Sequence, residues 1–125
     1  MASAVNWFDI PVTDMNRAKA FYSTLLGGEL HDEANDVAMG KAGAMAILPF
    51  QDGVGGALMQ GDDYTPSRQG SIVYLNGGDD LSVPLGKVEA AGGKVLTDKI
   101  SIGENGFIAF FLDTEGNRVG LHSMS

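Results

Sequence analysis

Cysteine is absent from this 125-residue chain, so the protein has no disulfide bonds, no thiolate zinc site and no cysteine nucleophile. Long apolar runs are also missing. None approaches the ~20 residues that a membrane-spanning helix needs, and the first residues lack the basic and then apolar pattern of a secretory signal. We therefore expect a cytoplasmic protein with no membrane partner, whose fold rests on side-chain packing alone.

Positive charge is scarce. Eight Lys and Arg residues stand against sixteen Asp and Glu residues, which gives a formal net charge of −8, and the basic residues are scattered instead of forming a stripe. Such a chain would repel a phosphate backbone, so nucleic acid is not expected as a partner. The eighteen glycines lie between periodic segments and predict many tight turns.

Several catalytic motifs are missing as well. The sequence contains no nucleophile elbow and no histidine-rich metal helix. The glycine-rich run Gly53-Val54-Gly55-Gly56 leads into a predicted strand and not into a helix, so it lacks the helix N-terminus that binds phosphate. We interpret this run as a hairpin turn.

The first half of the chain predicts one strand, one helix and then three short strands. Residues 5–12 are rich in strand-forming types, and Pro11 lies close to the end of that run. Asp14 then precedes apolar residues at spacings of three, four and seven, which is typical of an amphipathic helix, and Gly27-Gly28 ends it. Turn signals separate the strands predicted at about residues 37–40, 44–50 and 55–60.

The second half repeats this order. Pro84 is tolerated only in the first turn of a helix, so the second helix is expected to begin near Ser82 and to stop at Gly92-Gly93. The predicted elements are a strand at residues 71–75, a helix at about 81–91, and strands near 94–96, 107–112 and 117–122. Because repeated units are expected to share a core, we predict one α+β domain of residues 1–125, with βαβββ modules at about 5–60 and 71–123 and a linker at 61–70.

Three motifs follow one another along the chain. They are an opening segment at residues 10–22 that contains Asp14 and Phe21-Tyr22, a Gly-Gly helix end at 90–95, and a closing hairpin at 110–121 built on Asp113-Thr114-Glu115-Gly116-Asn117. Together they span essentially the whole chain and resemble the motifs of the glyoxalase/bleomycin-resistance/dioxygenase superfamily, also called vicinal oxygen chelate proteins. The resemblance implies a cupped, mostly antiparallel half-barrel sheet with the helices outside. It does not specify a reaction.

The resemblance also locates the positions at which metalloenzymes of this family bind one divalent ion. The ligands come from the first and last strands of each half, and here those positions are Trp7, a residue on or near Ser71, Gly120, and either Gly56 or Ala57. Divalent ions take oxygen or nitrogen ligands, which His and Glu usually supply, so none of these residues suits one. We therefore predict no metal cofactor and treat a divalent metal as the disfavoured alternative.

Asp9 and His122 are the remaining candidates for a metal or acid–base pair. They are expected to share the inward face with Trp7 and Gly120, because strand side chains alternate with period two, but two ligands alone make a weak site. Asp9 could act as a general base or hold a cationic or hydroxyl ligand, or it could hydrogen-bond to a turn or to Arg17. For His122, near the end of the last strand, a partly exposed, solvated imidazole is favoured over catalysis.

Two other side chains stand out. His31 lies in the polar run His31-Asp32-Glu33 after the first helix and is expected to be solvated. Trp7 places a large indole where the family has a ligand, so it could fill part of the cavity and offer a stacking face, or it could be plain core.

We favour metal-independent binding of a small molecule in an apolar cavity, as in drug-sequestering relatives. The predicted lining residues, of which two are also the catalytic candidates, are Trp7, Asp9, Leu48, Met59, Ser71, Val73, Phe110 and His122. The alternative is a lyase, isomerase or dioxygenase, lactoylglutathione-lyase-like or dioxygenase-like, with a divalent metal in a rearranged site. Only fold analogy supports that alternative. A third hypothesis is an assembly module, since relatives commonly pair, and we expect a homodimer.

Overall fold

The computed structural model describes residues 4–33 and 43–125. The chain divides into two compact units, Met1–Pro66 and Ser67–Ser125, and each holds one four-stranded sheet. The division falls inside the segment predicted as the linker, residues 61–70. That the whole chain is one domain stays a prediction. Within the described ranges, no helix has the length and apolar character needed to cross a bilayer.

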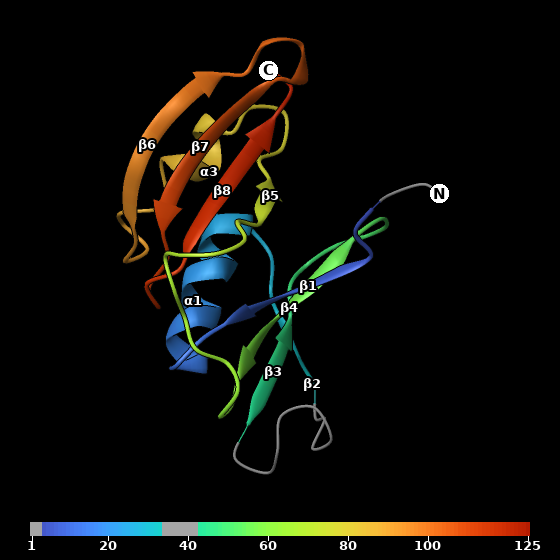
Figure 1. Cartoon of the computed structure of the whole chain (residues 1–125), viewed down its shortest axis with the longest axis vertical. Coiled ribbons are helices and arrows are strands. Elements are labelled where there is room, and N and C mark those ends of the chain that lie inside the picture. Colours follow the sequence, from blue (N-terminus) through green and yellow to red (C-terminus); the bar gives the residue numbers. More distant parts are fainter. Residues whose placement is uncertain (1–3, 34–42) are drawn as a thin grey trace. The chain divides into compact units, whose positions relative to one another are not determined.

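The first unit has the predicted β-α-β-β-β order (Figure 1). Its sheet has the strand order β1-β4-β3-β2, in which β1 runs parallel to β4 and the other pairs are antiparallel. The elements are β1 (Trp7–Pro11), α1 (Met15–Leu26), β2 (His31–Glu33), β3 (Ala44–Ile47) and β4 (Gly55–Gln60).

The position of β2 was not predicted. We expected a strand at residues 37–40, a segment outside the described residues, and a solvated polar run at His31-Asp32-Glu33. That run is the edge strand β2, and all three of its residues are exposed. An edge strand needs only backbone pairing on one side, so polar residues are compatible with it and give no apolar signal. His31 is solvated as expected, with 76% of its side chain exposed.

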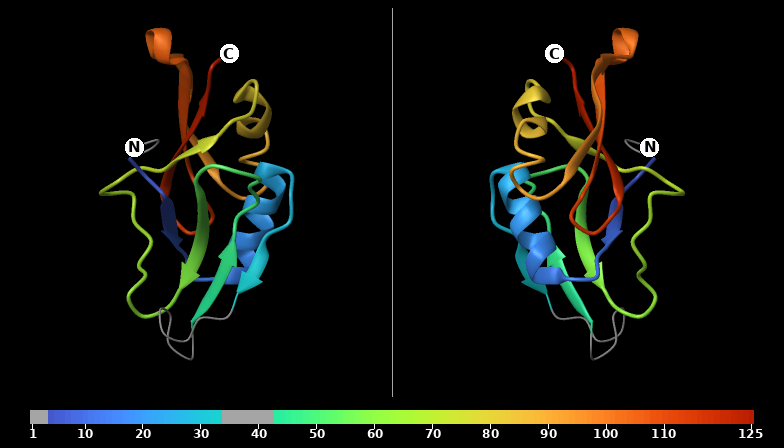
Figure 2. Two further views of the ribbon diagram at one scale, coloured as in Figure 1. Left: turned by 90° about the vertical axis from the view of Figure 1, so that its right-hand side faces the viewer. Right: turned by 90° about the vertical axis from the view of Figure 1, so that its left-hand side faces the viewer.

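Helix α1 begins and ends where the sequence predicts. The Asp14 carboxylate accepts the N–H of Arg17 at 3.1 Å, and Gly27 ends the helix in the left-handed conformation at φ 71°. Gly27 then donates its N–H to the Ser23 carbonyl at 2.9 Å. Figure 2 shows α1 running beside the strands of the first sheet, where it contacts β3 and β4. Its buried residues are Met15, Ala18, Phe21, Tyr22 and Leu25.

The second unit repeats the topology of the first, with strand order β5-β8-β7-β6 and β5 parallel to β8. Neither sheet closes into a barrel within the described part of the chain. The two tandem modules and the α+β class are therefore confirmed. The elements are β5 (Tyr74–Asn76), α3 (Ser82–Leu85), β6 (Lys94–Ser101), a 3-10 turn η1 (Gly103–Asn105), β7 (Phe107–Leu112) and β8 (Arg118–Ser123).

Three elements of the second unit differ in length from the prediction. Strand β5 is shorter than residues 71–75, and β6 extends well beyond 94–96. Helix α3 starts at Ser82, with Pro84 in its first turn as predicted, but ends at Leu85 instead of continuing to residue 91. Gly86 follows directly, and glycine in a helix interior costs about 1 kcal/mol relative to alanine. Hydrogen-bonded turns fill the rest of that segment.

The closing hairpin between β7 and β8 is held by Asp113, one of the few buried polar residues. Its Oδ1 accepts the N–H groups of Glu115 at 2.9 Å and Asn117 at 2.8 Å. Asn117 Nδ2 also donates to Asp113 Oδ2 at 3.0 Å. The Asp-x-x-Gly-Asn motif is thus a structural unit that satisfies its own buried polar groups.

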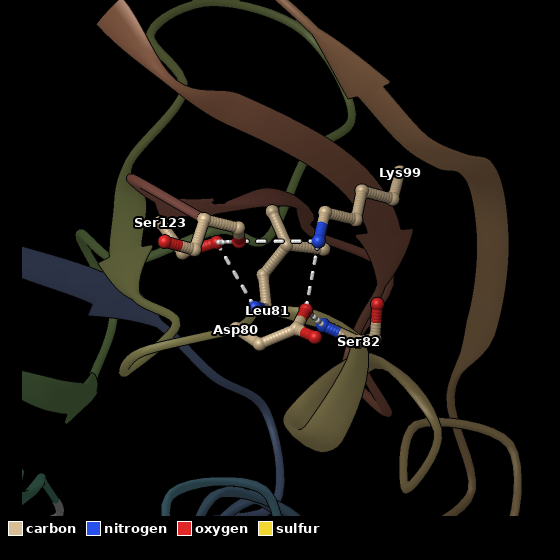
Figure 3. A network of polar contacts seen from close by, with 6 residues as sticks. Asp80, Leu81, Ser82, Lys99 and Ser123 are labelled. Carbon is tan, nitrogen blue, oxygen red and sulfur yellow. Dashed lines mark hydrogen bonds and ion pairs between the residues drawn. The ribbon is translucent and has the colours of Figure 1, made fainter.

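A second polar network joins the start of α3 to β6 and to the C-terminus (Figure 3). Lys99 Nζ donates to Asp80 Oδ1 at 2.9 Å, and the same oxygen accepts the Ser82 N–H at 2.9 Å. Leu81 N–H donates to Ser123 Oγ at 3.0 Å. The hydrogen bond from Lys99, together with those from Ser82, lowers the pKa of Asp80 to about 2.

Candidate functional site

One face of the first sheet packs against helix α1, which contacts β3 and β4, and the other face is the one that carries the candidate residues. In the first unit the register pairs Trp7 with Gly55 and Asp9 with Ala57, and side chains alternate along a strand, so these four residues share one face. This is the open face, because Trp7 is 41% exposed and Asp9 is exposed. The same face also carries Met45, Ile47 and Met59, and it is open only around Trp7 and Asp9, because Met45 and Tyr64 pack against the buried Ala57 and Met59. The buried positions on the opposite face include Ile10, Ala46 and Leu58.

Leu48 does not belong with the other predicted lining residues of the first unit. Its N–H donates to the Gly56 carbonyl at 3.0 Å, which continues the register of β3 and places Leu48 on the face of Ala46, opposite to Trp7. Gly56 faces the same way, since a Cβ atom there would meet the Phe8 ring. Of the two positions left open for the family ligand, Ala57 is therefore the one on the open face.

Trp7 forms an aromatic corner with Phe50. The ring centroids lie 6.1 Å apart in an edge-to-face arrangement, and a Cβ atom on Gly55 would lie 2.8–2.9 Å from both side chains. The two rings therefore cover the backbone of β4 at Gly55. Because Phe50 is 49% exposed and Trp7 41%, this corner offers aromatic surface to solvent and is not plain core.

Asp9 lies beside Ala57 on the same open face. Within the described part of the chain its carboxylate has no hydrogen bond or ion pair, so the two structural roles considered for it, bonding to a turn or to Arg17, are not found. Arg17 Nη2 instead donates to Thr13 Oγ1 at 3.3 Å. The carboxylate is exposed and open to a ligand.

The open face of the second unit is built around Gly120. The register pairs Gly120 with Tyr74 on one side and with Phe110 on the other, and His122 lies two residues further along the same face. The Tyr74 and Phe110 rings lie 5.7 Å apart. A Cβ atom at Gly120 would lie only 2.5 Å from Cδ1 of Tyr74, so the tyrosine ring fills the space into which a side chain at position 120 would project.

Two of the other predicted residues of this unit, His122 and Val73, hydrogen-bond to the backbone of the same unit. His122 Nε2 lies 2.7 Å from the Asn105 carbonyl oxygen, so in the neutral imidazole Nε2 carries the proton and donates it, which leaves Nδ1 as the acceptor. Val73 and Ser71 precede β5; the Val73 carbonyl accepts the Gly120 N–H at 2.9 Å, and Ser71 is exposed. His122 is half-buried, which fits the expected partly exposed imidazole better than a free general base.

The structure provides no cluster of metal ligands in the residues that it describes. No group of three or more His, Asp or Glu side chains is placed there to hold an ion. Asp9 lies in the first unit and His122 in the second. The residues present at the family positions, an indole, a serine hydroxyl, an alanine and a glycine, do not fit a divalent metal.

One hollow was missed entirely by the sequence analysis. It lies within the second unit, has a volume of about 560 Å³, and contains none of the predicted lining residues. Its walls are Arg68, Gln69, Gly70, Leu96 and Arg118. In the sequence Arg68 and Arg118 are fifty residues apart, and no local pattern shows that they converge.

The fold agrees with the comparisons with known proteins. The family model of the Glyoxalase/Bleomycin resistance protein/Dioxygenase superfamily matches residues 4–121. The chain belongs to this superfamily. A glyoxylase-like domain-containing protein from Didymella fabae is 32% identical over 114 residues, which cover 90% of this chain and 88% of that protein. The putative glyoxylase CFP32 of Mycobacterium bovis is 30% identical over 118 residues, 93% of this chain.

Solved structures of the superfamily show the same fold. A glyoxalase I mutant from Zea mays has a TM-score of 0.72 at 24% identity, over 94% of this chain and 45% of that chain. The fosfomycin resistance protein FosX from Listeria monocytogenes has a TM-score of 0.69 at 15% identity, over all of this chain and 94% of that one. The chain spans less than half the length of CFP32, at 44%, and of the maize enzyme.

Proposed function

We propose that this glyoxalase-superfamily chain binds a small molecule without a metal, on an aromatic open face of its sheets. The observation that carries the proposal is the arrangement at Gly120, the family ligand position of the last strand. A metal-binding side chain there would need the space that the Tyr74 ring occupies. Aromatic rings that line a concave or open face bind organic molecules by stacking and burial.

The first unit supports the same proposal. Trp7 stands where the family places its first ligand, and with Phe50 it presents an exposed aromatic corner beside the Asp9 carboxylate. Asp9 gives this face one acceptor group, which suits a ligand that carries a hydroxyl or a cationic group. Trp7 and Asp9 are thus the residues of the first unit that we assign to binding, while Leu48, on the opposite face, and Met59, which is buried under Met45 and Tyr64, are left out.

The competing function is a metal-dependent lyase, isomerase or dioxygenase. The E126Q mutant of FosX from Listeria monocytogenes has been solved with Mn(II) and 1S,2S-dihydroxypropylphosphonic acid, so metal-bound members of the fold exist. For this chain an enzyme of that kind would depend on Asp9 and His122, and the Asn105 carbonyl already engages one nitrogen of His122. The residues that the structure describes do not supply the ligand set of such a site.

A ligand screen read by tryptophan fluorescence tests the proposal. Trp7 is the only tryptophan, so its emission reports on this face alone. With a set of small aromatic and aliphatic compounds, we expect saturable changes in emission that are identical with and without EDTA. Calorimetry should then show that Trp7→Ala abolishes binding, whereas Val83→Ala, which removes another exposed apolar side chain, leaves it intact. Binding that EDTA removes, or that survives Trp7→Ala, contradicts the assignment.

We also propose that the chain forms a homodimer. Exposed apolar side chains gather around the aromatic corner, at Val5, Trp7, Phe50 and Val54, and such surface is commonly covered by a partner. Sedimentation equilibrium should give twice the chain mass. A monomer at every concentration tested would refute this part of the proposal and with it the assembly-module hypothesis.

A further inference from the structure

The hollow of the second unit has walls that carry concentrated positive charge. It is an open, shallow hollow bordered by a loop at residues 68–70, by the first residue of β8 and by Leu96 of β6. Two of its five lining residues are arginines, and the others are a glutamine, a glycine and a leucine. In a chain of net charge −8, two arginines and no acidic residue around one hollow are an unusual local excess of positive charge.

The loop that carries Arg68 is fastened to the strand that carries Arg118. Ser67 N–H donates to Asn117 Oδ1 at 3.0 Å, and Gln69 N–H donates to Ser67 Oγ at 2.9 Å. Asn117 is itself buried and held by Asp113, so the backbone of the loop that carries Arg68 is tied to the hairpin that carries Arg118. Preorganised donors lose less conformational entropy when a ligand binds.

Arg118 is oriented by an aromatic ring. Its guanidinium carbon lies 4.4 Å from the centroid of Phe110, a cation–π contact on the open face. A guanidinium group that contacts a ring in this way keeps the N–H groups that point away from the ring available for hydrogen bonds. The hollow therefore borders the aromatic face around Gly120.

Neither arginine has a charged partner in the described part of the chain. Other cations do: Lys19 pairs with Asp32 at 2.8 Å, and Lys99 with Asp80 at 2.9 Å. No ion pair or side-chain hydrogen bond involves the guanidinium group of Arg68 or Arg118. Two unpaired like charges beside one hollow repel each other, and an anion between them would relieve the repulsion.

We infer that this hollow binds the oxyanion, a carboxylate or a phosphate-type group, of a small organic molecule. Arg68 and Arg118 bind the anion with paired N–H groups, Gln69 adds a neutral donor, and Leu96 and Phe110 contact the apolar body of the ligand. The inference rests on the proposed function, because it names the ligand class for the open face of the second unit.

Anion binding can be measured without the natural ligand. ¹⁵N-labelled protein is titrated with inorganic phosphate, and separately with acetate, at a constant ionic strength set by NaCl. We expect saturable changes in the amide chemical shifts, confined to residues 68–70, Leu96 and Arg118. Saturation by phosphate alone or by acetate alone supports the site and identifies the anion class. Shifts that do not saturate with either anion, or that are equal with chloride, overturn the inference.

Charge-matched variants complete the test. Arg118→Gln and Arg68→Gln should each weaken binding at least about tenfold, because each removes charge-assisted hydrogen bonds, whereas Lys87→Gln, with the same change in net charge at an exposed site outside the hollow, should not. Arg118→Lys keeps the charge but loses the paired donors, and it should also weaken binding. Arg68 is exposed, and within the described residues its side chain makes no hydrogen bond or ion pair, so its variant remains informative if Arg118→Gln is unstable.

The two proposals fail separately. If Arg68→Gln binds phosphate as tightly as Lys87→Gln does, the anion site is wrong, while the fluorescence titration at Trp7 is unaffected. If metal is required for ligand binding at Trp7, the proposed function is wrong, while saturable phosphate binding in the second unit would still stand.

Discussion

At the scale of single residues, Gly120 and Tyr74 decide whether the last strand can present a metal ligand. The tyrosine ring lies over the glycine on the open face and also contacts Phe110. Glycine is required here by the close approach of a side chain and not by an unusual backbone angle, since Gly120 is not among the glycines with positive φ. The same relation holds at Gly55 under Trp7 and Phe50.

Gly120→Ala should destabilise the protein by about 1–2 kcal/mol, because the added methyl group must displace the Tyr74 ring. Chemical denaturation measures the change. In a Tyr74→Ala background the same substitution should cost much less, and the double-mutant cycle isolates the contact. If Gly120→Ala lowered the free energy of unfolding equally in both backgrounds, the Tyr74 ring would not be what fills this space.

Asn117→Ala should cost about 1–3 kcal/mol, because it leaves buried groups of Asp113 and the Ser67 N–H without their partner. It should also weaken phosphate binding, since the loop that carries Arg68 loses its anchor. Asn16→Ala, at an exposed helix position, is the control and should change neither quantity. A stable Asn117→Ala variant with unchanged phosphate binding would contradict the anchoring role.

At the scale of elements, the network of Figure 3 fixes α3 against β6. Asp80 has a pKa of about 2 in the folded protein against 3.8 for the free side chain, chiefly because Lys99 donates to its carboxylate. A depressed pKa contributes stability that is fully present above pH 4 and is lost as the pH falls toward 2.

The stability difference between the wild type and Asp80→Asn should therefore shrink as the pH falls through that window. Urea denaturation at pH 5, 4, 3 and 2 measures it at low salt, where an exposed ion pair is least screened. A difference that stays constant across this range would show that the carboxylate charge is not what Lys99 stabilises.

The sequence predicts some elements better than others, and the reason is physical. Helix α1 has its N-cap at Asp14 and its left-handed stop at Gly27 because local chemistry determines both ends. Strand β2 is fixed by backbone pairing with β3 and carries only polar residues, so no periodicity reveals it. The short α3 likewise reflects Gly86 in a segment whose apolar spacing alone predicts a longer helix.

The sequence predicts the arrangement of the candidate site only where the alternation of side chains along one strand determines which residues share a face. Trp7 and Asp9 share a face, as do Gly120 and His122, because period-two alternation is set locally. Leu48 was misplaced because its face depends on the register of β3 with β4, one residue past the strand end. Arg68 and Arg118 meet through the hydrogen bonds of Ser67 and Asn117, which tertiary structure alone creates.

At the scale of the whole molecule, superfamily membership is established and the metal is the open question. The chain has the repeated βαβββ topology of glyoxalase relatives, yet the positions from which relatives bind an ion hold Trp7, Ala57 and Gly120. Sequence similarity at 30% to a putative glyoxylase therefore does not by itself assign a reaction to this chain.

Elemental analysis of the purified, untagged protein tests this account most directly. After dialysis against a mixture of Zn, Ni, Mn and Fe salts and removal of unbound ions, the account predicts negligible metal per chain, and Asp9→Asn and His122→Ala should leave that value unchanged. Near-stoichiometric metal that either substitution removes would contradict metal-independent binding and would support the enzyme alternative built on Asp9 and His122.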